Sequence, residues 1–156
     1  MNIKTFFILP LITMSLYAGS TTSHINIGAN SIAIDSRSGN GFDISCGASV
    51  IFKNRVFGTF DFSYGQSNIN NEITNNYGID LKLGYKYHNI ALYFIGSGIE
   101  QSYISTNGVG FGFGSGVEYT PFKHIGFGLD YKTYSMTSSK QEYDFKVTKA
   151  YLKIIF

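Results

Sequence analysis

The sequence contains no tryptophan, two prolines and a single cysteine among its 156 residues. One cysteine, Cys46, cannot form a disulfide within the chain, and it excludes the multi-cysteine sites that hold structural zinc. Charged residues make up only 14%, and the net charge of +2 arises without any basic run, so no nucleic-acid partner is predicted. No transmembrane helix is predicted either, because no window approaches about 18 uninterrupted apolar residues.

The first twenty residues have the pattern of a secretory signal peptide. Lys4 gives the positive start, residues 6–16 the apolar segment, and residues 18–20 a small-residue exit. We therefore predict a signal peptide over residues 1–20 and one folded domain over residues 21–156. An exported chain without disulfides must be held together in another way, and closed hydrogen bonding between strands is one such way.

Apolar and polar residues alternate through most of the remaining chain. With 12 Tyr, 14 Phe and 18 Gly without a three-residue period, the composition favours strands and excludes a collagen-like chain. In one segment Ile79, Leu81 and Leu83 share one face, while Asp80 and Lys82 share the other. A period of two predicts a β-strand. The same alternation is present in residues 42–52, 60–64, 111–119, 125–131 and 148–156.

Two segments are less regular. Between Ile27 and Ile32 the apolar positions change parity, which predicts a β-bulge. In residues 90–101 both faces are apolar for much of the segment, and Glu100 is the residue that marks the polar face. Both segments are nevertheless predicted to be strands.

The predicted connections alternate between short and long. Tight turns are expected near Asn54, near Asn89 and at residues 121–123. Longer connections are expected at residues 36–41, 66–76, 102–109 and 135–142. The 136 residues after Ser20 allow 17 for each of eight strands, enough for about ten residues across a bilayer and a connection. The fold class predicted is all-β: an eight-stranded antiparallel up-and-down transmembrane β-barrel.

Charge placement indicates which face of the barrel wall points outward. With the apolar face outward, no charged residue must face the centre of a bilayer, where Arg or Lys would cost about 2–4 kcal/mol. This favours a membrane barrel; a soluble, lipocalin-like barrel is the weaker alternative. The charges then expected inside are Asp43, Asp61, Asp80, Lys82, Lys86, Glu100, Glu118, Asp130, Lys132, Lys149 and Lys153.

Opposite charges confined in a narrow interior are expected to pair, because a lone buried charge is costly. Gly112, Gly114 and Gly116 share one inward face, and Gly126 and Gly128 continue it on the next strand. These glycines leave room for long side chains opposite, such as Tyr151, Lys149 and Lys153. We therefore predict a plugged lumen, with a water-filled interior as the alternative. The structural charge network is predicted to consist of Asp80, Lys82, Lys86, Glu118, Asp130, Lys132, Lys149 and Lys153.

Aromatic residues are predicted at the ends of the strands, where a membrane barrel meets the two bilayer interfaces. The girdle is expected to include Tyr64, Tyr77, Tyr119 and Tyr143. The last strand carries Leu152, Ile154 and Phe156 on its apolar face and ends on that aromatic residue. This C-terminal signature is the predicted assembly signal.

No catalytic residue, cofactor or metal site is predicted. Some small membrane barrels are enzymes that act on lipids with His, Ser and an acid near the outer rim, but His24, His88 and His124 map to the other, periplasmic edge. The spacing of these histidines is not diagnostic of a metal site, and polar turn residues are the commoner explanation.

The passage GVEYTPFKHIGFGLDYKTYS at residues 116–135 and the ending VTKAYLKIIF resemble the OmpA/OmpX-like outer-membrane β-barrel family. The resemblance implies a location in the outer membrane of a Gram-negative bacterium and roles from envelope integrity to adhesion, immune evasion and slow solute passage. The function expected is that of a non-enzymatic barrel that stabilises the envelope and contacts surfaces through its external loops, above all residues 66–76. A narrow porin is the alternative, and a lipid-modifying enzyme a weaker one. The partners expected are outer-membrane lipid and lipopolysaccharide, the insertion machinery and a host or environmental surface ligand.

Overall fold

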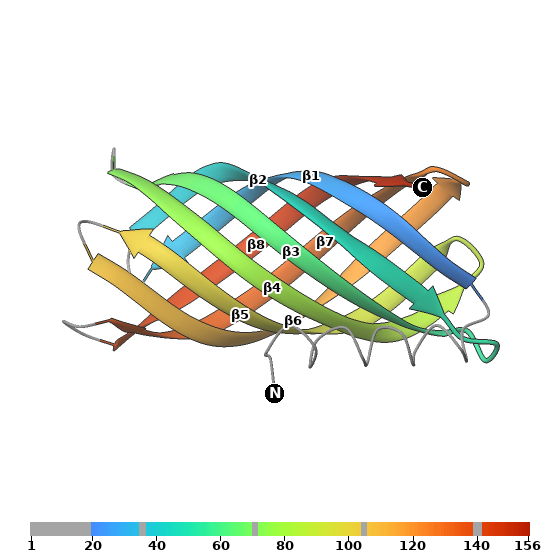
Figure 1. Cartoon of the computed structure of the whole chain (residues 1–156). Helices are drawn as coiled ribbons and strands as arrows, with labels where there is room; N and C mark the ends of the chain where they lie inside the picture. Colours follow the sequence, from blue (N-terminus) through green and yellow to red (C-terminus); the bar gives the residue numbers. More distant parts are fainter. Residues whose placement is uncertain (1–19, 35–36, 70–71, 104–105, 139–141) are drawn as a thin grey trace, which may run out of the picture.

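The structure is a computed structural model that describes residues 20–34, 37–69, 72–103, 106–138 and 142–156. Within these ranges it consists of eight antiparallel strands and the turns that join them (Figure 1). The strands are β1 (Ser20–Ile34), β2 (Arg37–Ile51), β3 (Val56–Ile69), β4 (Glu72–Tyr87), β5 (Ile90–Tyr103), β6 (Thr106–Phe122), β7 (Ile125–Ser138) and β8 (Glu142–Ile155). No helix within the described ranges is long and apolar enough to cross a membrane.

The sheet closes on itself. Each strand pairs with the next, and β8 pairs with β1 from Phe145 opposite Ile34 to Ile155 opposite His24. Beyond that ladder, the Phe156 N–H donates to the carbonyl oxygen of Ser23 at 2.9 Å. Because every strand has two neighbours, no sheet edge is left open. The prediction of an eight-stranded antiparallel up-and-down barrel is confirmed.

The two ends of the barrel differ in what they carry. We call the end at which β1 begins and β8 finishes the terminal end, and the opposite end the hairpin end. At the terminal end, tight turns join β2 to β3, β4 to β5 and β6 to β7. Arg55 and His88 take positive φ values of 68° and 53° in two of them, as sharp reversals require. These turns lie where the sequence predicted them, the third at residues 123–124. The predicted signal peptide, residues 1–20, lies outside the described residues except for Ser20.

The prediction of longer connections at the hairpin end is wrong. Strands of 14 to 17 residues occupy the described parts of the segments that were predicted as loops, which are residues 37–41, 66–69, 72–76, 102–103, 106–109, 135–138 and 142. Their Asn, Ser and Thr residues suggested loops, yet they alternate between the two faces of the wall. Thr74 is 0% exposed inside the barrel, whereas neighbouring Ile73 is 63% exposed outside it. Polar residues within strands, and not loops, account for this composition.

The prediction of a β-bulge in β1 is also wrong. The pairing of β1 with β2 and with β8 runs without a register shift. Ile27 points outward and Ile32 inward, because the interior changes from polar to apolar along this strand. A register shift lies instead between β6 and β7, next to Tyr119 and Phe122.

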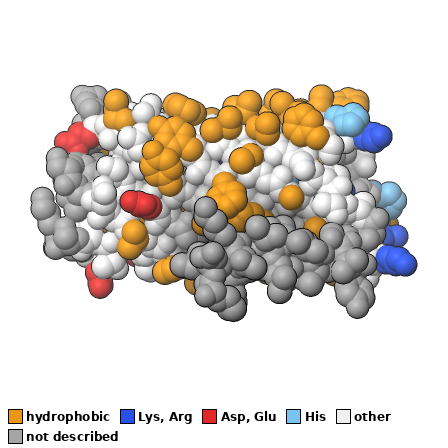
Figure 2. Space-filling view, viewed as in Figure 1, with side chains coloured by type: hydrophobic (Ala, Val, Ile, Leu, Met, Phe, Trp, Pro, Cys, Tyr) orange, Lys and Arg blue, Asp and Glu red, His pale blue; other side chains and the backbone are white. Residues whose placement is uncertain are grey.

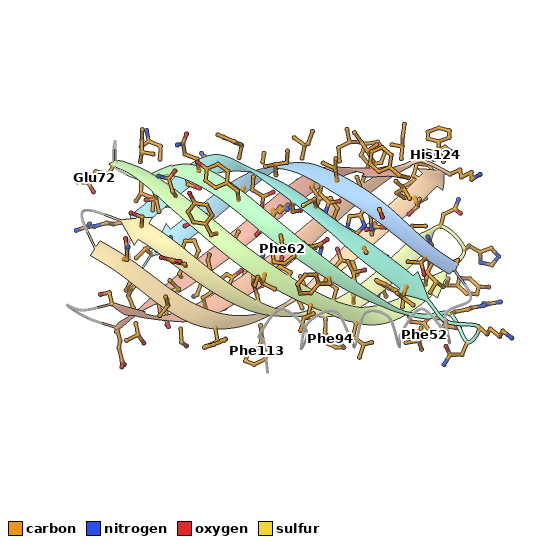
Figure 3. All side chains as sticks on the ribbon, viewed as in Figure 1. Phe52, Phe62, Glu72, Phe94, Phe113 and His124 are labelled. Atoms are coloured by element: carbon orange, nitrogen blue, oxygen red, sulfur yellow. The ribbon has the colours of Figure 1, made fainter. Side chains whose placement is uncertain are left out.

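The outer wall is an apolar band. Figure 2 shows hydrophobic side chains along the barrel, with Lys, Arg and His gathered at the terminal end and acidic side chains toward the hairpin end. Phe94 and Phe113 project away from the wall (Figure 3), and both are strongly exposed together with Phe111. An exposed apolar surface of this kind is what a bilayer would cover.

Candidate functional site

The inner face of the wall carries the chemistry of this protein. Strand alternation directs five carboxylates and five lysines toward the lumen within the described residues. All but one are at least nine-tenths buried; the exception, Lys86, is half-buried near the terminal end. The inward charged residues are Asp43, Asp61, Asp80, Glu118 and Asp130 with Lys82, Lys86, Lys132, Lys149 and Lys153.

Lys82 is the centre of this arrangement. Its Nζ lies 3.3 Å from Asp61 Oδ2 and 3.1 Å from Asp130 Oδ2, so one ammonium joins β4 to β3 and β7. The same nitrogen lies 5.2 Å from the ring centres of Tyr93 and Tyr151. Two carboxylates and two aromatic faces together replace the hydration that the buried cation has lost.

The chain of contacts continues from Asp130 across the barrel. The Tyr93 hydroxyl donates to Asp130 Oδ1 at 2.5 Å and lies 2.8 Å from the Tyr151 hydroxyl. Tyr151 donates to Glu118 Oε2 at 3.3 Å, and Lys153 donates to the same oxygen at 2.9 Å. Each tyrosine hydroxyl has one proton, and here both protons are donated to carboxylates, so the Tyr93–Tyr151 approach is a close contact of two oxygens. Side chains from four strands thus lie in one continuous chain of polar contacts.

Two further ion pairs complete the interior network. Lys132 Nζ lies 2.9 Å from Asp80 Oδ2, and the Ser97 hydroxyl donates to the same aspartate. Lys149 Nζ lies 2.6 Å from Asp43 Oδ1. All eight strands contribute a side chain to this network. Of the residues predicted for it, seven lie in these contacts and Lys86 lies apart, toward the terminal mouth.

A row of inward glycines on β6 makes room for these side chains. A Cβ at Gly112 would lie 2.6 Å from the Thr133 carbonyl oxygen and 2.8 Å from Tyr134 Cγ. A Cβ at Gly114 would lie 2.8 Å from Lys132 Cγ. The β6 glycines are therefore covered by inward side chains of neighbouring β7 and, at Gly116, by Tyr93 of β5. At the β7 glycines the predicted side chains are present: Tyr151 packs over Gly128, and Lys153 Cβ lies 3.5 Å from a Cβ placed at Gly126. Lys149 is not among the nearest neighbours of either row.

Apolar clusters lie on either side of the charged layer. Toward the hairpin end, residues of β1, β3, β7 and β8 form a buried cluster, and Ile99 of β5 packs against it from across the lumen. Toward the terminal end, Phe57 packs with Ala91, Tyr93 and Ile95. The hairpin-end cluster consists of Ile32, Ile34, Ile69, Tyr134, Met136, Phe145 and Val147.

His24 is an interior residue that the sequence analysis assigned to the periplasmic edge. It is buried, and its Nε2 lies 2.6 Å from Asp61 Oδ1. Ser49 Oγ lies 3.5 Å from His24 Nδ1, but its nearer partner is Thr59 Oγ1 at 2.9 Å. The order Ser, His, Asp is that of a hydrolase triad, yet the long Ser–His distance and the nearer threonine fit a structural network better. His24 lies an even number of residues from Asn26 and Asn30 in β1, so all three side chains share one face of the strand. The polar character of that face was the signal that could have placed His24 inside.

Two residues lie on the opposite face of the barrel wall from the one predicted. Glu100 is exposed on the outside, and neighbouring Gln101 is fully buried, because β5 directs its odd-numbered residues inward. Tyr143 was assigned to the outer girdle, but it packs against the interior apolar cluster and its hydroxyl donates to Gln101 Oε1 at 2.9 Å. In both strands apolar side chains lie inside, Ile95 in β5 and Phe145 in β8, so the rule that the apolar face is the outer one indicated the wrong face.

The other girdle and C-terminal residues lie on the outer surface. Tyr77 and Tyr119 are exposed, and half-buried Tyr64 lies beside Tyr77 with their ring centres 5.2 Å apart. Leu152, Ile154 and Phe156 are exposed along the outer face of β8. In the described part of the chain, no three potential metal-ligating side chains lie together.

Comparison with known proteins places this barrel among membrane proteins. Residues 6–156 match the family described as the outer membrane protein beta-barrel domain. Neisserial surface protein A has a similar structure, with a TM-score of 0.61, 13% identity, and coverage of 89% of this chain and 99% of that one. Ail, the attachment invasion locus protein of Yersinia pestis, gives a TM-score of 0.59 with 10% identity, covering 87% and 97%. Another structure of Ail holds the heparin analogue sucrose octasulfate.

A designed protein shares the fold as well. A structure from the de novo design of transmembrane β-barrels gives a TM-score of 0.56 with 12% identity, covering 86% of this chain and 95% of that one. No curated protein matches this sequence. Because these identities are low, the structural similarities show the fold alone.

Proposed function

This chain belongs to the outer membrane protein beta-barrel family, and we propose that it is a non-enzymatic, largely plugged barrel that stabilises the envelope and contacts other surfaces. Its location is the outer membrane of a Gram-negative bacterium. The observation that supports the plug is Lys82, which is held between Asp61 and Asp130 in the middle of the lumen. An eight-stranded barrel is only just wide enough for its own side chains, and ion pairs that extend across the lumen between β4 and β7 support a plug.

The buried charges support a structural role for the network. Taking a lysine out of water costs several kcal/mol, and paired carboxylates offset that cost only when the geometry is good. Here each of the four buried lysines lies within 3.3 Å of a carboxylate oxygen. Apart from Lys82–Asp61, these pairs connect strands that are not neighbours, so the network resists distortion of the barrel in cross-section. The hairpin-end cluster adds a dry layer above it.

Conductance of the refolded chain in a planar bilayer tests this proposal. A heat-dependent gel shift first shows that the chain is folded, and a porin of larger strand number in the same bilayer shows that the recording detects pores. We expect no discrete current steps from this chain, because the Lys82–Asp130 and Lys132–Asp80 pairs extend across the lumen between β4 and β7. Discrete, salt-dependent steps would overturn the plug and establish the alternative, a narrow porin.

We propose that the hairpin end is the surface presented to the exterior, since β1 begins and β8 finishes at the opposite end (Figure 1). Among the described residues at this end, the exposed charged side chains are mostly acidic. A heparin-like polyanion such as the one bound to Ail would require a mostly basic surface. The surface ligand proposed here is therefore neutral or cationic. The exposed charged residues at this end are Glu72, Glu100, Glu142 and Asp144 with Arg37 and Lys146.

The remaining partners follow from the outer wall. We propose that lipid and lipopolysaccharide cover the apolar band, and that the insertion machinery reads Leu152, Ile154 and Phe156. All three are exposed along β8, the strand that closes the barrel against β1. A recognition segment at the closing strand would allow the machinery to release the chain once β1 has paired.

A further inference from the structure

A cavity of about 270 Å³ opens at the terminal end of the lumen. We call it the vestibule. Its wall includes Lys86, Lys123 and Lys153, one carboxylate from Glu118, and the hydroxyl of Ser49. Phe57 and Ala91, which belong to the terminal-end apolar cluster, line another part of it. The vestibule is thus a charged pocket with one dry wall.

The only carboxylate among the residues lining the vestibule is already occupied. Glu118 accepts hydrogen bonds from Lys153 at 2.9 Å, Tyr151 at 3.3 Å and Thr120 at 3.3 Å. Lys86 interacts with Glu118 electrostatically but forms no ion pair within 4 Å in the described part of the chain. Three ammonium groups therefore line the vestibule with one carboxylate, which leaves an excess of positive charge.

The surroundings increase this excess. Lys53 and Arg55 are exposed on the turn between β2 and β3, and cationic and histidine side chains gather at this end in Figure 2. Arg55 lies over the ring of Tyr87, 5.3 Å from its centre, so its charge is held beside the barrel rim. The apolar wall of Phe57 and Ala91 also weakens solvent screening inside the vestibule. An anion that enters meets a converging positive field.

We propose that the vestibule binds a phosphate group, either free or as the head group of an anionic phospholipid in the adjoining leaflet. Ammonium groups act as point-charge donors to phosphate, and each has three N–H donors. The hydroxyl of Ser49 and the amide of Asn89 also lie on the vestibule wall. Hydroxyl and amide donors together with lysines suit a tetrahedral oxyanion with several acceptor oxygens. This inference does not depend on whether the lumen conducts.

Titration calorimetry of the refolded chain in a non-ionic detergent tests the proposal with inorganic phosphate and glycerol phosphate as probes. The variant is the double substitution Lys86→Gln and Lys123→Gln, which leaves the Glu118–Lys153 pair intact. The control is Lys146→Gln, an exposed lysine on β8 toward the hairpin end. We expect saturable, salt-dependent binding that is weakened by about tenfold or more in the double variant, because two cations near the anion are lost. A heat-dependent gel shift shows that both variants fold.

A second measurement separates the two sources of phosphate. The chain is reconstituted in vesicles of phosphatidylcholine with or without phosphatidylglycerol, and the lipid retained after detergent extraction is measured. Binding of inorganic phosphate that the double variant weakens supports the vestibule as a site for the free anion. Selective retention of phosphatidylglycerol that the double variant loses supports the lipid head group. Binding of neither, or equal binding by the native chain and the double variant, would overturn the proposal.

Discussion

Leu81 and Lys82 are adjacent in the sequence and lie on opposite faces of the same strand. Leu81 is 59% exposed on the outer wall, while Lys82 is 7% exposed inside the barrel. The apolar residue is the exposed one and the charged residue is the buried one, the reverse of a soluble protein. The comparison shows that a single wall, one residue thick, separates two environments with opposite requirements.

The two faces tolerate their residues for different reasons. Outside, a side chain needs only to be apolar, because lipid accepts any such shape. Inside, each charge needs a particular partner at a particular distance, as Lys82 has in Asp61 and Asp130. The outer face is therefore specified by composition and the inner face by pairwise geometry. Substitutions at matched positions measure this difference.

The largest effect is expected from Lys82→Leu. This substitution leaves Asp61 with His24 as its hydrogen-bonding partner and leaves Asp130 without its cation, at a cost of about 3–5 kcal/mol in the free energy of unfolding. Urea unfolding in lipid vesicles, followed by the gel shift, measures it. Lys53→Leu, in an exposed terminal-end turn, is the control and should change stability by less than about 0.5 kcal/mol.

Adding Asp130→Asn to Lys82→Leu sharpens the test. If the loss arises from orphaned carboxylates, removing one of those charges should restore part of the stability. A double variant that is even less stable than Lys82→Leu would show that the cost arises from lost packing, and that the pairwise description of the inner face is incorrect.

A smaller effect is expected from Leu81→Lys on the outer face. Near the middle of the bilayer this change should cost about 2–4 kcal/mol, since no partner side chain is available in lipid. The control is Ile73→Lys, also outward but near the hairpin end, for which about 0–1 kcal/mol is expected. Unfolding in vesicles measures both. Equal costs at the two positions would show that the apolar band does not coincide with the bilayer core.

The same contrast explains how much of the structure could be predicted from the sequence. The outer face repeats one property every second residue, and this pattern, together with the chain length and the spacing of the connections, predicted eight strands and the closed antiparallel barrel. Where the inner face is also apolar, the rule fails. Tyr143 and Glu100 were assigned to the wrong faces because Phe145, Val147 and Ile95 lie inside.

The interior contacts could be predicted only in part. The sequence indicated that opposite charges would share the lumen, but not that Lys82 would lie between Asp61 and Asp130. Partners on non-adjacent strands depend on the tilt and stagger of the whole barrel, which residue order along one strand does not contain. For the same reason His24 was not expected beside Asp61, 37 residues away in the sequence.

Glycines on the two faces of the wall should differ as well, and by a smaller amount. Gly112→Ala would place a Cβ 2.8 Å from Tyr134 Cγ, and overpacking of this kind costs about 1–3 kcal/mol. Gly96 faces outward on neighbouring β5, and a Cβ there would meet nothing within 4 Å. Gly96→Ala should therefore be neutral or slightly stabilising, since alanine loses less backbone entropy on folding. Urea unfolding of the two variants compares them directly. If both glycines tolerate alanine equally, the inner face can shift to accept a methyl group, and the lumen is less tightly packed than its buried contacts indicate.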